Sequence, residues 1–252
     1  MKKLIRTLQT SFPALQEYRL STERHFRKLL GRVHENDFNA LSLFPDEAGA
    51  VYIDIGANRG QSIESILARR SKARIVSFEP NPYLFQNLVS RYASSSNVTI
   101  HNLGLGDAET RSVLHVPFYR KYMFDGLASL NRDEAAGWLK GGLYWYNEKL
   151  LSVKEITCHV KRLDDFRLNP YFIKIDTQGF EMKILTGAQK TLQAHTPILL
   201  IEDATPEITS FLSNFGYQSY RYENNAFATG YGSPNTFYIA DDKFKKLRQG
   251  GK

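Results

Sequence analysis

Short apolar runs alternate with amphipathic stretches along the chain from residue 51 onward. The β-branched run at 51–55 is followed by 62–70, where Ile63, Ile66 and Leu67 share one helical face. Further runs with strand character follow, and most are separated by stretches with helical spacing. These expected strands are 73–78, 97–103, 171–176 and 197–203, followed by 217–223 and 235–240, which can pair as a terminal hairpin. The alternation predicts an α/β fold with a parallel sheet covered on both faces.

The chain divides into four expected segments. Residues 1–47 look helical and form an N-terminal arm or cap, 48–242 form the sheet-containing domain, and 243–252 form a basic tail. Within the domain, 117–150 is too long for an ordinary connection and is expected to be an insertion or lid. Its eight aromatic residues can close a hydrophobic lid or stack on sugar rings. They are Phe118, Tyr119, Tyr122, Phe124, Trp138, Tyr144, Trp145 and Tyr146.

Composition narrows the class of protein. The 252 residues are 42% hydrophobic, enough for one domain with an extension. No apolar stretch approaches the roughly 20 residues of a membrane-spanning helix, and no signal-peptide block opens the chain. The single cysteine, Cys158, leaves no disulfide framework, and the six histidines show no metal-ligand spacing. We expect a soluble cytoplasmic protein without a metal site.

The formal net charge of +7 is concentrated at the two ends of the sequence. Residues 1–32 carry +6 and 243–252 carry +5, while the remainder carries −4. A nucleic-acid-binding face would be expected to look different, so this distribution disfavours nucleic acid as a partner. The basic ends are expected either to be solvated tails or to contact an anionic membrane peripherally.

A candidate ligand site lies where the first expected strand ends. The segment D-x-G-A-N-x-G lacks the middle glycine that a dinucleotide fingerprint needs for its pyrophosphate. An acid at the strand end suits an ammonium group, and the N–H groups that open the next helix suit a carboxylate. S-adenosylmethionine carries both groups. The residues expected to hold it here are Asp54, Gly56, Ala57, Asn58, Gly60 and Gln61.

Two later strand ends extend this site. Glu79 follows the second strand, where an acid can accept both hydroxyls of a ribose, and Asn81 caps the next helix. Gly106 and Asp107 follow the third strand, where an adenine can be held. Three strand ends in register favour a cofactor site for S-adenosylmethionine over the alternative of turn glycines and capping acids in an ordinary α/β protein.

Several short motifs follow one another along the chain. They are D-I-G-A-N-R-G-Q-S, F-E-P-N-P, L-G-L-G-D, L-D-D-F, I-K-I-D-T-Q-G-F-E at 173–181 with I-L-T-G-A after it, and I-E-D. In this order they resemble the FkbM-type S-adenosylmethionine-dependent methyltransferases, and I-K-I-D-T-Q-G-F-E is the most specific of them. The resemblance implies a class I, Rossmann-like fold with a seven-stranded, mostly parallel sheet and an antiparallel last strand. It also implies methyl transfer, usually to a hydroxyl of a sugar, polysaccharide or secondary metabolite.

Three acidic residues are candidates for the chemistry of an O-methyltransferase. Asp176 ends the fourth strand, where cofactor and acceptor must meet, and is expected to contact both. Glu181 and Glu202 are candidates for orienting or deprotonating the acceptor hydroxyl. Each has a structural alternative, because Glu181 can stabilise a helix dipole and Glu202 can neutralise Lys174.

Rival functions remain open at this stage. One is an RNA methyltransferase that uses the basic ends, and another is a nicotinamide-dependent oxidoreductase, which the glycine spacing disfavours. A third is a binding module that keeps the fold without catalysis. The sequence favours an O-methyltransferase for a hydroxylated small molecule or glycan and leaves the acceptor and the oligomeric state unassigned.

Overall fold

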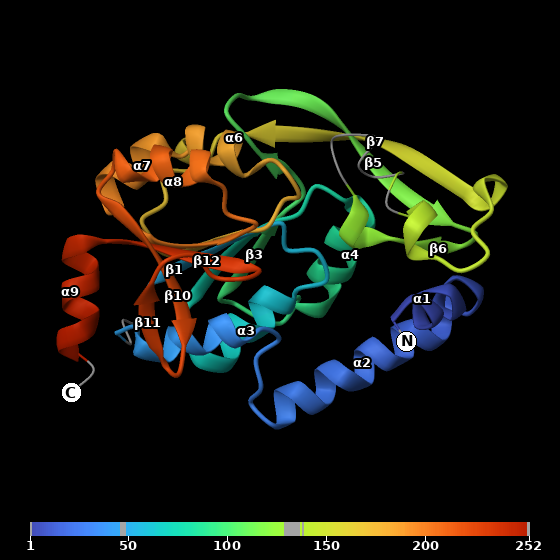
Figure 1. Cartoon of the computed structure of the whole chain (residues 1–252), viewed down its shortest axis with the longest axis horizontal. Coiled ribbons are helices and arrows are strands. Elements are labelled where there is room, and N and C mark those ends of the chain that lie inside the picture. Colours follow the sequence, from blue (N-terminus) through green and yellow to red (C-terminus); the bar gives the residue numbers. More distant parts are fainter. Residues whose placement is uncertain (1, 46–48, 129–136, 138, 251–252) are drawn as a thin grey trace. The chain divides into compact units, whose positions relative to one another are not determined.

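The computed structural model describes residues 2–45, 49–128, 137 and 139–250. The chain forms two compact units, which are coloured along the sequence in Figure 1. Unit 1 comprises residues 1–31 and 111–159, and unit 2 comprises 32–110 and 160–252. The boundary at Gly31 therefore divides the expected arm and groups its first part with the long insertion.

Unit 2 is built around an eight-stranded sheet in the order β11-β10-β12-β9-β8-β1-β2-β3. Strands β3, β2, β1, β8 and β9 are parallel to their neighbours in that series, whereas β12 runs antiparallel to both β9 and β10. The strands are β1 (Val51–Ile55), β2 (Arg74–Phe78), β3 (Val98–His101), β8 (Pro170–Ile175), β9 (Ile198–Glu202), β10 (Tyr217–Glu223), β11 (Ala226–Thr229) and β12 (Asn235–Ala240). The mostly parallel sheet with an antiparallel strand is confirmed.

The number of strands differs from the expected seven. Residues 226–229 form β11, which pairs antiparallel with β10 at the edge of the sheet. The turn between them uses Asn224 and Asn225 with φ values of 51° and 60°. Asparagine tolerates this left-handed conformation better than most residues, so the pair supports a tight hairpin that adds an eighth strand.

Helices cover both faces of this sheet. On one face, α3 (Gln61–Arg69), α4 (Pro82–Arg91), α9 (Asp241–Gly250) and the 3₁₀ helix η1 (Asn36–Leu43) contribute to one apolar cluster. On the other, α6 (Glu181–Thr186), α7 (Gln189–His195) and α8 (Pro206–Ser213) contribute to a second cluster and lie together in Figure 1. Adjacent strand residues such as Phe172 and Ile173 belong to opposite clusters, as the alternation of side chains along a strand requires.

The described residues of unit 1 include the helices α1 and α2 and most of a second sheet. Its elements include α1 (Lys2–Ser11), α2 (Pro13–Leu29), β5 (Thr110–Tyr119), β6 (Tyr122–Met123) and β7 (Leu151–Lys161), with the 3₁₀ turns η2 (Asp125–Leu127) and η3 (Glu148–Leu150). The second sheet has the order β4-β7-β5-β6, where β4 (Gly104–Leu105) belongs to unit 2.

The long aromatic segment supplies a small core of its own. Tyr119, Tyr122 and Phe124 are buried together with Leu139 and Leu143, while Tyr144 and Trp145 are exposed. Trp138 lies outside the described residues. The segment therefore folds as part of a compact unit. Across the described parts of both units, every helix is too short or too polar to cross a membrane.

Candidate active site

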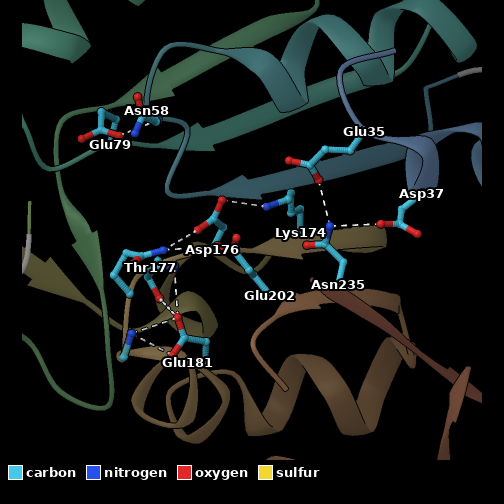
Figure 2. Close-up of polar contacts among 12 residues, drawn as sticks. Glu35, Asp37, Asn58, Glu79, Lys174, Asp176, Thr177, Glu181, Glu202 and Asn235 are labelled. Atoms are coloured by element: carbon cyan, nitrogen blue, oxygen red, sulfur yellow. Dashed lines mark hydrogen bonds and ion pairs between the residues drawn. The ribbon is translucent and has the colours of Figure 1, made fainter. Parts of the chain in front are cut away.

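Acidic side chains gather where the parallel strands of unit 2 end (Figure 2). Asp54 lies on β1, Glu79 directly after β2, Asp176 directly after β8, and Glu202 at the end of β9. These strands are neighbours in the sheet, so their carboxyl ends form one edge. That edge is where open α/β sheets bind ligands.

Asp54 is fully buried and incompletely paired. One carboxylate oxygen, Oδ2, accepts a hydrogen bond from the Ser77 hydroxyl at 3.4 Å, and the other, Oδ1, has no hydrogen-bond partner among the described residues. Burial raises the pKa of Asp54 to about 6, although the nearby Lys174 charge opposes the shift. A buried, unsatisfied carboxylate oxygen is costly, so a cationic or N–H-bearing ligand would stabilise it.

The glycines after β1 fix the path of the loop. Gly56 has φ 84°, and a Cβ atom there would lie 1.9 Å from the backbone oxygen of Asp176. Gly60 has φ 87° and caps α3, so Gln61 is the first residue of that helix. Between them, Ala57 is buried and its N–H donates to the carbonyl of Phe78. The loop is therefore held against both neighbouring strand ends.

Glu79 is anchored by backbone donors on both sides. Its carboxylate accepts hydrogen bonds from the N–H of Asn58 at 2.7 Å and the N–H of Asn81 at 2.8 Å. The side chain of Asn81 in turn caps α4 by accepting from the N–H of Tyr83. Asn58 adopts φ 47°, and its buried Oδ1 has no partner among the described residues. A second acceptor thus faces the same edge without a donor.

Gly106 and Asp107 follow β4 in unit 2. The N–H of Gly106 donates to the carbonyl of Lys161, and a Cβ atom on Gly187 would lie 1.9 Å from the Gly106 oxygen. Asp107 is exposed. No described hydrogen bond or ion pair joins either residue to Asp54 or Glu79, so their part in the site stays a prediction.

Lys174 is a buried cation among carboxylates. Its ammonium lies 2.9 Å from Oδ2 of Asp176, and the residue is 1% exposed. Burial would lower the pKa of Lys174, but the charges of Asp176 and Glu35 outweigh it and raise that pKa. Lys174 and Asp176 are therefore both charged, and the Lys174 charge also acts on Glu202, whose pKa it lowers.

Asp176 and Glu202 lie together, and each shifts the pKa of the other. Burial would raise the pKa of Asp176, but the Lys174 charge and a hydrogen bond with Glu202 hold it below its ordinary value. The same hydrogen bond, burial and the Asp176 charge raise the pKa of Glu202 to about 8. The Gln178 amide donates to Glu202 at 3.2 Å and contacts Asp176 at 3.5 Å. Near neutral pH, the pair shares one proton between two acids.

Glu181 is occupied by its own loop. Its carboxylate accepts hydrogen bonds from the N–H and hydroxyl of Thr177, both at 3.1 Å, and from the N–H of Gly179 at 3.0 Å (Figure 2). These contacts close the turn between β8 and α6, directly after Asp176. Glu181 therefore holds this turn in place, which is a structural role, and its role toward an acceptor stays a prediction.

Three further polar residues meet the site without having been expected there. The Asn235 amide at the start of β12 donates to Glu35 at 2.8 Å and to Asp37 at 3.1 Å, and its Oδ1 has no partner among the described residues (Figure 2). Burial raises the pKa of Asp37. A polar residue opening an otherwise apolar strand was the available signal for Asn235, which is opposite Glu202 in the sheet register.

No metal site emerges from the described residues, because no three His, Cys, Asp or Glu side chains gather to hold an ion. Asp164 instead accepts hydrogen bonds from the backbone of Lys190 and Thr191, which caps α7. Asp165 pairs with Arg162 at 2.9 Å. The L-D-D-F segment therefore joins elements of the fold.

Comparisons with known proteins find similar chains and folds. A solved structure of methyltransferase FkbM from Methylobacillus flagellatus KT is similar with a TM-score of 0.50 and 19% identity, covering 81% of this chain and 48% of that chain. The AMB antimetabolite synthetase AmbE of Pseudomonas aeruginosa is 30% identical over 195 residues. That match covers 65% of this chain but 9% of the relative's length.

The family model described as the methyltransferase FkbM domain matches residues 54–219. This range begins at the buried acid of β1 and reaches into β10, so it includes the four acidic strand ends described above. The fold, with its mostly parallel sheet and antiparallel β12, is that of the class I methyltransferases. The chain belongs to the FkbM methyltransferase family.

Proposed function

We propose that this chain is an S-adenosylmethionine-dependent O-methyltransferase that acts on a hydroxyl group of a sugar, glycan or secondary metabolite. The observation that carries the proposal is two buried acceptors without a hydrogen-bond partner among the described residues, Oδ1 of Asp54 on β1 and Oδ1 of Asn58 in the loop after it. Asn58 also donates its N–H to the anchored carboxylate of Glu79. A ligand with an ammonium group and ribose hydroxyls would supply donors to these acceptors.

The residues present fit this cofactor. Asp54 would accept from its ammonium group, and the N–H groups at the start of α3 would face its carboxylate. Backbone hydrogen bonds hold both Glu79 oxygens in place, and the ribose hydroxyls would donate to this carboxylate. S-adenosylmethionine supplies an electrophilic methyl group on a sulfonium.

The chain's own residues would then align and deprotonate the acceptor. Methyl transfer to oxygen requires the hydroxyl to approach in line and to lose its proton. Asp176 and Glu202 lie at the strand ends where that hydroxyl would arrive, and Lys174 fixes the orientation of Asp176. The pKa of Glu202 is raised to about 8. Once Glu202 has lost its proton, the pair can therefore take the proton of an acceptor hydroxyl near neutral pH.

Two rivals are weighed against this proposal. Membership of a methyltransferase family argues against the nicotinamide oxidoreductase. An RNA methyltransferase has the same cofactor requirement, so the acceptor decides between the two. A carboxyl pair with a raised pKa suits an acceptor that must lose a proton during transfer, such as a hydroxyl. The assay of acceptors separates a hydroxyl of a sugar or metabolite from one of RNA.

The test has two stages. Calorimetry with S-adenosylhomocysteine should show binding, while the same titration with NAD should show none. Labelled methyl transfer from S-adenosylmethionine is then screened on hydroxylated sugars, glycan fragments and total RNA, and mass spectrometry locates the methyl group. Failure to bind S-adenosylhomocysteine would remove the cofactor assignment, and a methyl group found on nitrogen or on RNA would remove the acceptor assignment.

A further inference from the structure

The chain's positive charge belongs entirely to unit 1. This unit contains fourteen Lys and Arg residues against seven Asp and Glu, a net charge of +7. Unit 2 contains nineteen of each and is formally neutral. Net charge of one sign on a compact unit attracts partners of the opposite sign and weakens with added salt. Unit 1 is therefore the part of the protein suited to an anionic surface.

Unit 1 also exposes apolar side chains. Of the thirteen large hydrophobic residues that are exposed among those described, nine lie in unit 1. They are Leu8, Phe12, Tyr18, Phe26, Leu29, Leu30, Val113, Tyr144 and Trp145. Trp145 is 85% exposed and Leu29 is 74% exposed. Scattered exposed leucines need no explanation, but this concentration in one basic unit does.

One group of these residues is held in place around α1. The ammonium of Lys3 lies 4.9 Å from the ring centre of Tyr144, and the N–H of Tyr144 donates to the Thr7 hydroxyl at 3.0 Å. Arg120 donates to the Ser11 hydroxyl at 3.4 Å. Trp145 follows Tyr144 directly and contacts its ring at a centroid distance of 6.0 Å. Cations and amphipathic rings thus share one fixed surface.

A second group lies at the end of α2. Phe26, Leu29 and Leu30 are exposed within one turn, and the exposed Lys28 lies between them in sequence. Aliphatic and aromatic side chains next to lysine are the composition of a surface that inserts into the boundary between headgroups and acyl chains. Lys28 would meet the acidic headgroups while the apolar side chains leave water.

We propose that unit 1 docks the protein on a lipid bilayer that contains acidic lipids. The docking surface comprises Leu8, Phe12, Tyr144 and Trp145 around α1, and Phe26, Leu29 and Leu30 at the end of α2, with Lys3 and Lys28 as its cations. The charge of unit 1 supplies attraction, and the exposed apolar side chains supply insertion. A nucleic acid would use the same charge but would leave Leu8, Leu29 and Leu30 without a role.

The basic C-terminal end differs in the property that matters. In α9, Phe244 packs against the core of unit 2 and Leu247 is buried in it. Lys245 lies 3.8 Å from Asp242 of the same helix. This end presents charge without exposed large apolar side chains among its described residues. It is the matched control for charge alone.

Co-sedimentation of the full chain with vesicles tests the proposal. We expect binding to vesicles of phosphatidylcholine mixed with phosphatidylglycerol at low salt, and weak binding to phosphatidylcholine alone. Lys28→Glu should weaken binding on the order of tenfold, because it reverses one charge at the surface. Lys246→Glu makes the same change on α9 and should leave binding nearly unaltered.

The apolar contribution is tested separately. Leu29→Ser combined with Leu30→Ser should reduce vesicle binding on the order of tenfold or more. The two leucine side chains would leave water when the protein binds the bilayer, and the serines would not gain this free energy. Tyr231→Ser removes an exposed ring from unit 2 and serves as the control. Circular dichroism and S-adenosylhomocysteine affinity should be unchanged in each variant.

Fluorescence reports the depth of one side chain. The chain has two tryptophans, so Trp138→Phe leaves Trp145 as the sole tryptophan, which is excited selectively at a wavelength where tyrosine does not absorb. Its emission should shift to the blue with acidic vesicles and be quenched by lipids brominated on their acyl chains. Binding to neutral and acidic vesicles alike, an unshifted emission, or tighter binding to RNA than to acidic vesicles would each overturn the proposal. Salt-resistant self-association through the same residues would assign the surface to a second copy instead.

Discussion

The two units distribute polar and apolar side chains in opposite ways. Among the described residues, nine of the ten buried polar or charged residues lie in unit 2, and nine of the thirteen exposed large hydrophobics lie in unit 1. Unit 2 encloses charge where low dielectric strengthens each interaction, which suits chemistry. Unit 1 displays apolar and basic groups, which suits contact with a partner. If both proposals hold, the reaction and the attachment to a bilayer belong to different units of one chain.

This comparison is tested most strongly at Lys174, the buried cation of unit 2. Lys174→Met should lower the free energy of unfolding by roughly 3–5 kcal/mol, because it leaves Asp176 and its neighbouring carboxylates without their cation. Guanidinium denaturation at neutral pH measures the change. Lys190→Met, at an exposed position of α7, should have little effect. An unaltered midpoint for Lys174→Met would show that the site does not depend on this buried charge.

The next largest effect is expected at Asp176. Asp176→Asn keeps the shape of the side chain but removes its negative charge, so turnover of an identified acceptor should fall on the order of 10²-fold or more. Affinity for S-adenosylhomocysteine should fall far less, as calorimetry would show. If the variant turned over at the wild-type rate, the role of base would pass to Glu202, which is the other member of the pair.

Glu79 tests the cofactor side of unit 2. Glu79→Ala should weaken S-adenosylhomocysteine binding by about 1.5–3 kcal/mol, because a charged acceptor is lost. Part of this loss comes from the freed N–H groups of Asn58 and Asn81, which now donate to Glu79. Glu207→Ala, on the exposed surface of α8, is the control and should bind normally. Calorimetry measures the affinity of each variant, and circular dichroism checks that each is folded like the wild type. Wild-type affinity in a folded Glu79→Ala variant would contradict the prediction.

The pH profile tests the carboxyl pair directly. Because the pKa of Glu202 is raised to about 8, kcat/KM should rise with pH by about tenfold per unit below that value and level above it. Glu202→Gln should remove this rise. A wild-type profile that is flat between pH 6 and about 9 would contradict the assignment of the pair as base.

The same shift has a consequence for stability. The folded state binds the Glu202 proton more tightly than the unfolded state, whose pKa is near 4.5. Its stabilising contribution is therefore fully present below pH 4.5 and is lost as pH rises to about 8. Glu202→Gln should lose less stability than wild type across this window in denaturation series at fixed ionic strength.

Sequence patterns predicted the strands of unit 2 well because these strands are apolar and are bounded by turn residues. The run V-Y-I-D-I predicts a strand, and the glycines after it predict a turn at the edge of the sheet where ligands bind. Strand β1 has the expected bounds. Pairing between β10 and β12 is also confirmed. The eighth strand was missed because A-F-A-T at 226–229 is short and its turn depends on two asparagines.

Unit 1 was harder to predict from sequence. Strands β5 and β7 are ten and eleven residues long, yet their burial alternates weakly, so no apolar run marks them. The grouping of 1–31 with 111–159 is a long-range association that no local spacing encodes. The role of Asn235 was missed for the same reason, because Glu35 and Asp37 are about two hundred residues away in sequence.

The smallest effect on the free energy of unfolding is expected at Trp145, an exposed residue of unit 1. The side chain is 85% exposed, so its removal takes away little packing within the chain. The residue adopts φ 51°, a conformation that asparagine tolerates better than most residues. Trp145→Asn should therefore change the free energy of unfolding by no more than about 0.5 kcal/mol in guanidinium denaturation.

Tyr122, a buried aromatic of the same unit, is the matched contrast. Tyr122→Ala should cost about 3 kcal/mol or more, because the ring packs edge-on against Phe124 inside the small core. A large loss at Trp145 would mean that this side chain stabilises the folded chain itself. Its exposure would then no longer support a role in binding a partner. The contrast between a unit that buries polar groups and a unit that exposes apolar groups would not hold at that residue.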